Sequence, residues 1–227
     1  MPEAQNNLAA MYFYGQGVAE DYQEAALWYR KSADQGNAEG EAGLGWLYFC
    51  GLGVDEDWDE AGRLCRDAAG KGSEAACNVL GRICLSEGGE ENYREAMKWL
   101  RQAADRGNAE AELLLGDVYL HGLGVAEDPS EAAEWYRKSA DQGNPEAEDT
   151  LGCMYMNGSG VERDYEKAFA LFRAATEQGE SGALFHLGRL SDEIAQGDDD
   201  LREAAEWFRM AAERGEPEAA CDLGIMY

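Results

Sequence analysis

The chain has 227 residues, of which 46 are acidic and 19 basic, and its formal net charge is -27. This excess of carboxylates disfavours nucleic acid as a partner, because binding a phosphate backbone requires clustered Lys and Arg. The charge favours solubility and attraction to basic partners, and it is also compatible with a general adaptation such as a high-salt proteome. No apolar run approaches the roughly 20 residues that a spanning helix needs, so membrane insertion is not expected.

One pattern recurs along the whole sequence. Its marker is a leucine followed by a small residue, and successive markers are separated by 36, 36, 35, 36, 36 and 36 residues. The markers are Leu8, Leu44, Leu80, Leu115, Leu151, Leu187 and Leu223. Such a period, with two apolar segments per unit, is typical of a helical solenoid whose units bury their apolar faces against one another. We expect one elongated domain over residues 1–227, with units near 1–36, 37–72, 73–107, 108–143, 144–179 and 180–215 and a partial unit at 216–227.

The first segment of each unit, called helix A, is predicted from apolar residues at the spacing of one helical face. In the fourth unit these are Ala111, Leu115, Gly116 and Tyr119. Glycine follows the marker leucine in five of the six full units. Because glycine inside a helix costs about 1 kcal/mol relative to alanine, its recurrence predicts close approach of a neighbouring helix. A GxGV turn, as at 122–125, then ends helix A, since glycine permits positive φ.

The second segment, called helix B, is predicted to begin at a capping box, in which Asp or Asn is followed three residues later by Glu. The predicted boxes are Asp21 with Glu24, Asp57 with Glu60, Asn92 with Glu95, Asp128 with Glu131, and Asp200 with Glu203. The body of helix B follows AxxWY, and four of the six tryptophans share one position: Trp28, Trp99, Trp135 and Trp207. We interpret this ladder as core that joins the units rather than a surface for stacking bases, because the repeat is acidic.

Two units depart from the pattern in the turn between their helices. Unit 3 is one residue short and has Ser-Glu-Gly-Gly at 86–89 in place of GxGV. Unit 6 has Ser191 where other units have tyrosine, and an acidic turn at 198–200. We expect local changes in packing there, within an unchanged fold.

Cysteine and histidine positions argue against a disulfide framework and against catalysis. The six cysteines occupy six different positions of the repeat, which favours free thiols and a reducing compartment. Cys50 and His121 occupy the same position of the repeat in units that are two apart. Because neighbouring helices lie about 10 Å apart, these two side chains are too distant for the hydrogen bond that a nucleophile and its base require. Asp55, Asp57 and Asp59 lack the glycine and distal glutamate of a calcium loop. We expect no metal, no cofactor and no catalytic site.

AxxxLGxxY, GxGVxxD, AxxWY and the closing Ala-Asp-Gln-Gly-Asn at 33–37 and 140–144 together resemble the Sel1-like repeat family, which is related to tetratricopeptide repeats. The resemblance implies an all-α, right-handed α-solenoid of antiparallel helix pairs, with six full units plus a terminal helix. It also implies a non-catalytic scaffold or adaptor. Cysteine-rich members of the family have been linked to penicillin-binding or β-lactamase activity, and an enzyme of this kind is the alternative to a scaffold. That chemistry in other folds uses SerxxLys or a zinc site, and the sequence has no SerxxLys.

A partner surface is predicted on the concave side, if helix A lines that side as in the tetratricopeptide relatives. Positions two residues before and after each marker leucine vary between units, as residues without a scaffold role would. Exposed Trp, Arg and Phe are frequent interface anchors. The candidate partner-binding residues are Trp46, Arg82, Leu113, Asp117, His121, Asp149, Phe185 and Arg189.

The expected partner is a protein or peptide, and the acidity of the chain would suit a basic one. Open solenoid ends would also permit self-association, which makes a structural module a third interpretation. The repeat is cut close to a helix start at Met1 and within the seventh unit at Tyr227, as in a segment of a longer protein. A signal peptide or anchor could therefore precede it, so the compartment is left open.

Overall fold

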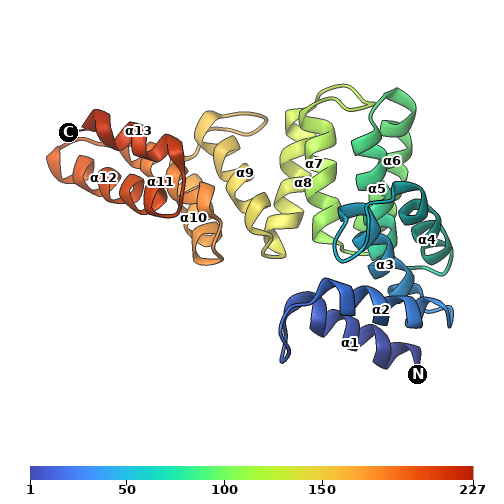
Figure 1. Cartoon of the computed structure of the whole chain (residues 1–227). Helices are drawn as coiled ribbons and strands as arrows, with labels where there is room; N and C mark the ends of the chain where they lie inside the picture. The colour runs from blue at the N-terminus through green and yellow to red at the C-terminus, as the bar shows by residue number, and fades with distance from the viewer. Residues whose placement is uncertain (227) are drawn as a thin grey trace. The chain divides into compact units, whose positions relative to one another are not determined.

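The structure is a computed structural model, and it describes residues 1–226 except for the side chains of Asp198 and Met226. Tyr227, which ends the predicted partial unit, lies outside the described residues. The described chain is all-helical, and helices A and B alternate along it (Figure 1). The A helices are α1 (Pro2–Tyr14), α3 (Ala38–Cys50), α5 (Glu74–Glu87), α7 (Ala109–Leu120), α9 (Pro145–Asn157), α11 (Ser181–Ile194) and α13 (Pro217–Met226). The B helices are α2 (Tyr22–Ala33), α4 (Trp58–Gly70), α6 (Glu90–Ala104), α8 (Pro129–Asp141), α10 (Tyr165–Glu177) and α12 (Asp198–Glu213).

The helices divide into two compact bodies. The N-terminal body comprises residues 1–111 and 123–125, and the C-terminal body comprises residues 112–122 and those from 126 onward. Within each body, helices A and B of a repeat pack together, as α3 does with α4 and α9 with α10, and B helices also pack on the next A helix, as α4 does on α5 and α10 on α11. The predicted six helix pairs followed by a terminal helix are thus confirmed. No helix within residues 1–226 combines the length and apolar character needed to cross a membrane.

The glycine after the marker leucine is where helices A and B approach most closely. A Cβ added at Gly152 of α9 would lie 2.6 Å from the ring of Phe172 on α10. At Gly116 of α7 the added atom would lie 2.5 Å from the ring of Tyr136 on α8. Real Cβ atoms essentially never come so close to another side chain, so any residue larger than glycine would push the helices apart. This confirms the close approach that the sequence predicts.

The aromatic core lies one residue beyond the predicted tryptophan ladder. Tyr136 and Phe172, which follow the ladder position, have no exposed surface, and Phe208 is also buried. Trp135 is only half-buried, with its Nε1 donating a hydrogen bond to Glu131 and the Lys138 ammonium 3.6 Å from its ring centre. The predicted ladder packs in or against the buried clusters, with Leu64 itself buried and Trp207 touching the clusters of two successive units. Trp99 and Trp135 lie at the edge of the core, where the indole Nε1 of each donates a hydrogen bond to a glutamate one turn earlier.

The turns between helices follow the prediction in the regular units. Asp21, Asp57 and Asp128 each cap a B helix by accepting a hydrogen bond from the backbone N–H three residues later. The second glycine of the turn, Gly160, has φ 69°, and a Cβ there would overlap the Pro129 carbonyl at the start of α8. Glycine is required at this turn for its conformation and for its lack of a side chain.

Units 3 and 6 differ from the other units as their turns suggested, and two predicted caps were wrong. Helix α6 begins at Glu90, so Asn92 lies inside it and donates to the Gly88 carbonyl. Helix α12 begins at Asp198, and Asp200 accepts from the Gln196 backbone N–H. Without the regular turn, the helix starts earlier along the chain, and the residue aligned with the cap position becomes a helical residue.

The six thiols are free and differ in exposure. Cys65, Cys77 and Cys84 are buried, Cys50 and Cys153 are half-buried, and Cys221 is exposed. Burial raises the pKa of Cys65 to about 12 and that of Cys84 to about 11. These two thiols therefore stay protonated at neutral pH and pack as small apolar groups.

Candidate functional site

The N-terminal body contains a groove of about 510 Å³ that is formed mainly by A helices. We call it the helix-A groove. Its walls come mainly from α1, α3 and α5, and the beginning of the next repeat also lines it. The lining residues used below are Asn6 and Phe13 from α1, Glu39 and Trp46 from α3, Asn78 and Arg82 from α5, and Asn108 and Glu110 from the fourth repeat.

Polar side chains in the helix-A groove form one connected network. Arg82 donates through Nε to Asn78 Oδ1 at 3.1 Å, and Asn78 donates through Nδ2 to Asn108 Oδ1 at 3.1 Å. The other end of the Arg82 guanidinium pairs with Glu110. The Arg82 Cζ also lies 5.7 Å from the centre of the Trp46 ring. A tryptophan face and a fixed guanidinium are thus held side by side at the wall of the groove.

One acceptor in the groove lacks a partner. Asn6 Oδ1 is buried from solvent, and no group within residues 1–226 donates a hydrogen bond to it. A buried acceptor without a donor costs about 1–3 kcal/mol, so such atoms are uncommon and often mark places where a ligand or water binds. Asn6 is two residues before the marker leucine of its unit, the same position as Asn78.

The eight candidate residues from the sequence do not form one site. Trp46 and Arg82 both line the helix-A groove. Arg189 is exposed and lines a separate cavity of about 870 Å³ in the C-terminal body. Leu113 and Phe185, with exposed fractions of 2% and 9%, are core residues, so they cannot provide the accessible surface expected of them.

The remaining three candidates lie in the C-terminal body. Asp117 accepts a hydrogen bond of 2.7 Å from the Tyr136 hydroxyl. Burial raises the pKa of Tyr136, and the interaction with Asp117 raises it further. His121 is exposed and directly follows α7. Asp149 is half-buried and faces a histidine of the next repeat.

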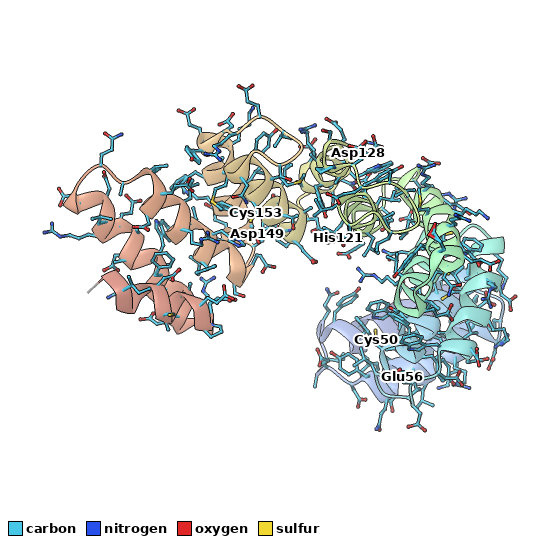
Figure 2. All side chains as sticks on the ribbon, turned by 90° about the horizontal axis from the view of Figure 1, so that it is seen from above. Cys50, Glu56, His121, Asp128, Asp149 and Cys153 are labelled. Carbon is cyan, nitrogen blue, oxygen red and sulfur yellow. The ribbon has the colours of Figure 1, made fainter. Side chains whose placement is uncertain are left out.

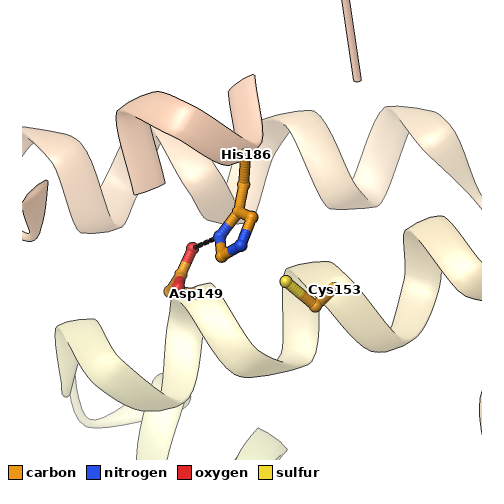
Figure 3. Close-up of side chains that lie close together, drawn as sticks. All are labelled: Asp149, Cys153 and His186. Atoms are coloured by element: carbon orange, nitrogen blue, oxygen red, sulfur yellow. Dashed lines mark hydrogen bonds and ion pairs between the residues drawn. The ribbon is translucent and has the colours of Figure 1, made fainter. Parts of the chain in front are cut away.

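That contact belongs to a second group of functional side chains, the Asp149–Cys153–His186 cluster. Asp149 and Cys153 are one turn apart on α9 (Figure 2), and His186 reaches them from α11 (Figure 3). The Asp149 Oδ1 atom lies 2.8 Å from His186 Nδ1, and the potential metal-binding atoms of all three residues lie within 4.8 Å of one another. The Cys153 thiol faces the other edge of the imidazole (Figure 3).

The cluster is partly shielded from water. The side chains of His186 and Asp149 are 24% and 16% exposed, and the Phe172 ring centre lies 5.3 Å from that of His186. Burial opposes protonation of the imidazole. The hydrogen bond to Asp149 and the neighbouring Cys153 sulfur outweigh burial and raise the pKa of His186 to about 10. The cluster therefore favours a positive charge at its centre.

Sequence reasoning identified Asp149 and missed Cys153 and His186. It compared cysteine with histidine at one shared position, which paired Cys50 with His121 two units apart. The contact instead joins Cys153, two residues after the marker leucine of one unit, with His186, one residue before the marker leucine of the next. Cys153 and His186 are 33 residues apart, close to one period, and that spacing was the available signal.

The fold and the repeating contacts define a class, that of all-helical tandem-repeat proteins. Within that class, the Sel1 repeat family model matches residues 2–37, 38–73, 74–108, 109–144, 145–180 and 182–216. The chain therefore belongs to the Sel1 repeat family, whose members are generally protein-interaction scaffolds. No curated protein sequence gave a match.

Solved structures of bacterial Sel1 repeat proteins resemble the chain. One is the protective antigen c5321 of uropathogenic Escherichia coli, with 33% identity and a TM-score of 0.78 over 100% of this chain and 49% of that one. The chain thus spans about half the length of that antigen. A second is a Sel1 repeat protein from Oxalobacter formigenes, with 30% identity, a TM-score of 0.77 and coverage of 93% and 85%. A Klebsiella pneumoniae protein shares 26% identity at a TM-score of 0.60, with coverage of 84% and 93%.

Proposed function

We propose that the chain is a non-catalytic adaptor that binds an extended segment of a partner protein in the helix-A groove. The family supports a role in protein interaction, and the groove supplies a place for it. The observation that carries the proposal is the unpaired Asn6 Oδ1 at the groove. The side-chain amides of Asn78 and Asn108 line the same groove. A peptide backbone N–H is the donor that would satisfy this acceptor.

The chemistry of the groove suggests what the segment looks like. Side-chain amides such as those of Asn78 and Asn108 can hydrogen-bond a peptide backbone regardless of its sequence. The Trp46 face offers a surface for an apolar or aliphatic side chain of the segment. Glu39 and Glu110 line the groove beside a single arginine, and the chain carries a net charge of -27, so a segment with basic side chains is favoured.

A peptide-display selection followed by affinity measurements would test the proposal. Peptides selected on the wild-type protein would be labelled, and their dissociation constants measured by fluorescence anisotropy. Trp46→Ala should weaken binding by about 30-fold, as expected for a central aromatic anchor worth about 2 kcal/mol. Asn6→Ala should weaken it by about 3- to 10-fold, the effect of one hydrogen bond.

Arg189→Ala is the matched control, because it removes a large side chain from a cavity in the C-terminal body. It should leave the dissociation constants unchanged. Circular dichroism would confirm that all variants remain helical. Peptides that bind wild type and Trp46→Ala equally well, or a selection that yields no binder to the wild type, would contradict the proposed groove.

A further inference from the structure

The Asp149–Cys153–His186 cluster has no role in the helix-A groove, since it lies in the other body. It brings together three different side chains that are each common ligands of zinc-like cations: a carboxylate, a thiol and an imidazole. Asp149 and Cys153 share one face of α9, and His186 approaches from the neighbouring A helix, α11 (Figure 3). Within residues 1–226, this is the one group of three or more such residues arranged closely enough to hold a metal ion.

We propose that Asp149, Cys153 and one ring nitrogen of His186 bind a divalent transition-metal cation of the zinc class. Three protein ligands leave the fourth tetrahedral position for water or a ligand from outside the chain, as in open zinc sites. An aspartate and a thiolate supply two negative charges, which balance a divalent ion. The mixture of sulfur, nitrogen and oxygen ligands favours Zn²⁺ over Mg²⁺ or Ca²⁺, because these harder cations prefer oxygen alone.

The distances are compatible with this coordination. Zn–N and Zn–O bonds of about 2.0 Å and Zn–S bonds of about 2.3 Å place ligand atoms roughly 3.3–3.6 Å apart in a tetrahedral site. In the cluster, the closest pair is separated by 2.8 Å, and no ligand atom is more than 4.8 Å from another. Movements of about 1 Å, which a change in the thiol or imidazole rotamer can provide, would complete the geometry.

The surroundings of the cluster also favour a bound cation. The partial exposure of Asp149 and His186 gives an ion a route from solvent, and the Phe172 ring shields the other side. The Asp149 carboxylate and the Cys153 sulfur both lie beside the imidazole, so an ion bound by His186 would be within reach of both. Because His186 must lose its proton to coordinate the metal, affinity should rise with pH.

Cobalt titration of the full, metal-free chain would test the proposal, with a non-thiol reductant keeping cysteines reduced. Co²⁺ bound to a thiolate gives a sulfur-to-metal charge-transfer band, and tetrahedral Co²⁺ gives intense visible bands. We expect both at one equivalent of Co²⁺ per chain. Cys153→Ser should remove the charge-transfer band, and competition with a chromophoric chelator should show Zn²⁺ affinity falling by at least about tenfold in Asp149→Asn and His186→Gln.

The chain offers a matched control for the cysteine ligand and for the histidine ligand. Cys50 is also half-buried on an A helix, and His121 is the only other histidine. Cys50→Ser and His121→Gln should keep the bands and the affinity. Absence of a charge-transfer band in the wild type, or a band that survives in Cys153→Ser, would overturn the proposal. Circular dichroism of each variant separates loss of the ligand from loss of the fold.

Discussion

The helix-A groove and the Asp149–Cys153–His186 cluster use the same positions of the repeat for different chemistry. In α5, Asn78 and Arg82 lie two residues before and after the marker leucine and hydrogen-bond to each other. In α9, Asp149 and Cys153 occupy those two positions and both face His186 (Figure 3). One pair presents an amide and a guanidinium, which suit a peptide. The other presents a carboxylate and a thiol, which suit a cation.

This comparison shows how the repeat separates structure from function. The residues that hold helices A and B together recur in each unit, so they carry no information specific to one unit. The positions two residues before and after the marker leucine differ between units, from the buried Leu113 and Phe185 to the exposed Arg189, so they can carry chemistry specific to one unit. The predictions below first test the shared scaffold beneath the two sites and then the features that differ between units.

The largest expected effect comes from the core beneath the cluster. Phe172 has no exposed surface and contacts both Gly152 and His186. Phe172→Ala should lower the free energy of unfolding by about 3–5 kcal/mol, measured by urea denaturation, because it leaves a cavity. Leu171→Ala, at the half-buried ladder position, is the control and should cost clearly less. Equal losses would mean that the ladder, and not the residue after it, is the core.

The second prediction concerns the cluster in metal-free protein. The folded-state pKa of His186 is raised from 6.5 to about 10, so its stabilisation is complete below pH 6.5 and is lost as the pH rises toward 10. The loss can reach at most about 1.4 kcal/mol per pH unit. The stability difference between wild type and His186→Gln, measured by urea denaturation with a chelator present, should shrink over this window.

His121→Gln serves as the control for that measurement, because its side chain is exposed and lies outside the cluster. Its stability difference from wild type should not change between pH 6.5 and 10. A constant difference for His186→Gln over the same range would show that Asp149 does not hold the imidazole in its charged form.

The third prediction tests the close approach of helices A and B. Gly152→Ala should destabilise the protein by about 1–3 kcal/mol, because the new methyl group would overlap the buried Phe172 ring. Gly70→Ala at the end of α4 is the control, since a Cβ there meets no atom within 4 Å. It should be neutral or stabilising by up to about 1 kcal/mol through higher helix propensity. The urea midpoint should fall for Gly152→Ala and should stay or rise for Gly70→Ala, and an equal fall in both would contradict the packing role.

The scaffold was predictable from sequence because each of its residues recurs at one period. The glycine contacts at Gly116 and Gly152 and the caps at Asp21, Asp57 and Asp128 illustrate this. Prediction was weaker for features found in one unit. The sequence did not show which of two adjacent residues in helix B is fully buried, because the tryptophan and the residue after it recur equally and the pattern cannot say which ring faces Gly116. Leu113 and Phe185 were predicted to be exposed because the residue at their position differs from unit to unit, whereas their side chains are buried.

The Asp149–Cys153–His186 cluster was missed for a geometrical reason. Three residues from two repeats meet only when two A helices are placed side by side with a definite offset, and the spacing within a unit does not fix that offset. The i and i+4 relation of Asp149 and Cys153 was visible in the sequence, but His186 as their third neighbour was not. The position of its imidazole depends on how α11 packs against α9 and α10.

The smallest expected effect distinguishes regular from altered turns. Asp128 accepts hydrogen bonds from the backbone N–H groups of Ser130 and Glu131, so Asp128→Ala should cost about 1 kcal/mol. Asn92 has the same place in the sequence pattern but lies within α6. Asn92→Ala loses one hydrogen bond to the Gly88 carbonyl and gains helix propensity, so its unfolding free energy should stay near that of the wild type. If Asn92→Ala costs as much as Asp128→Ala in urea denaturation, α6 begins at Asn92 in solution, and the turn of unit 3 is regular after all.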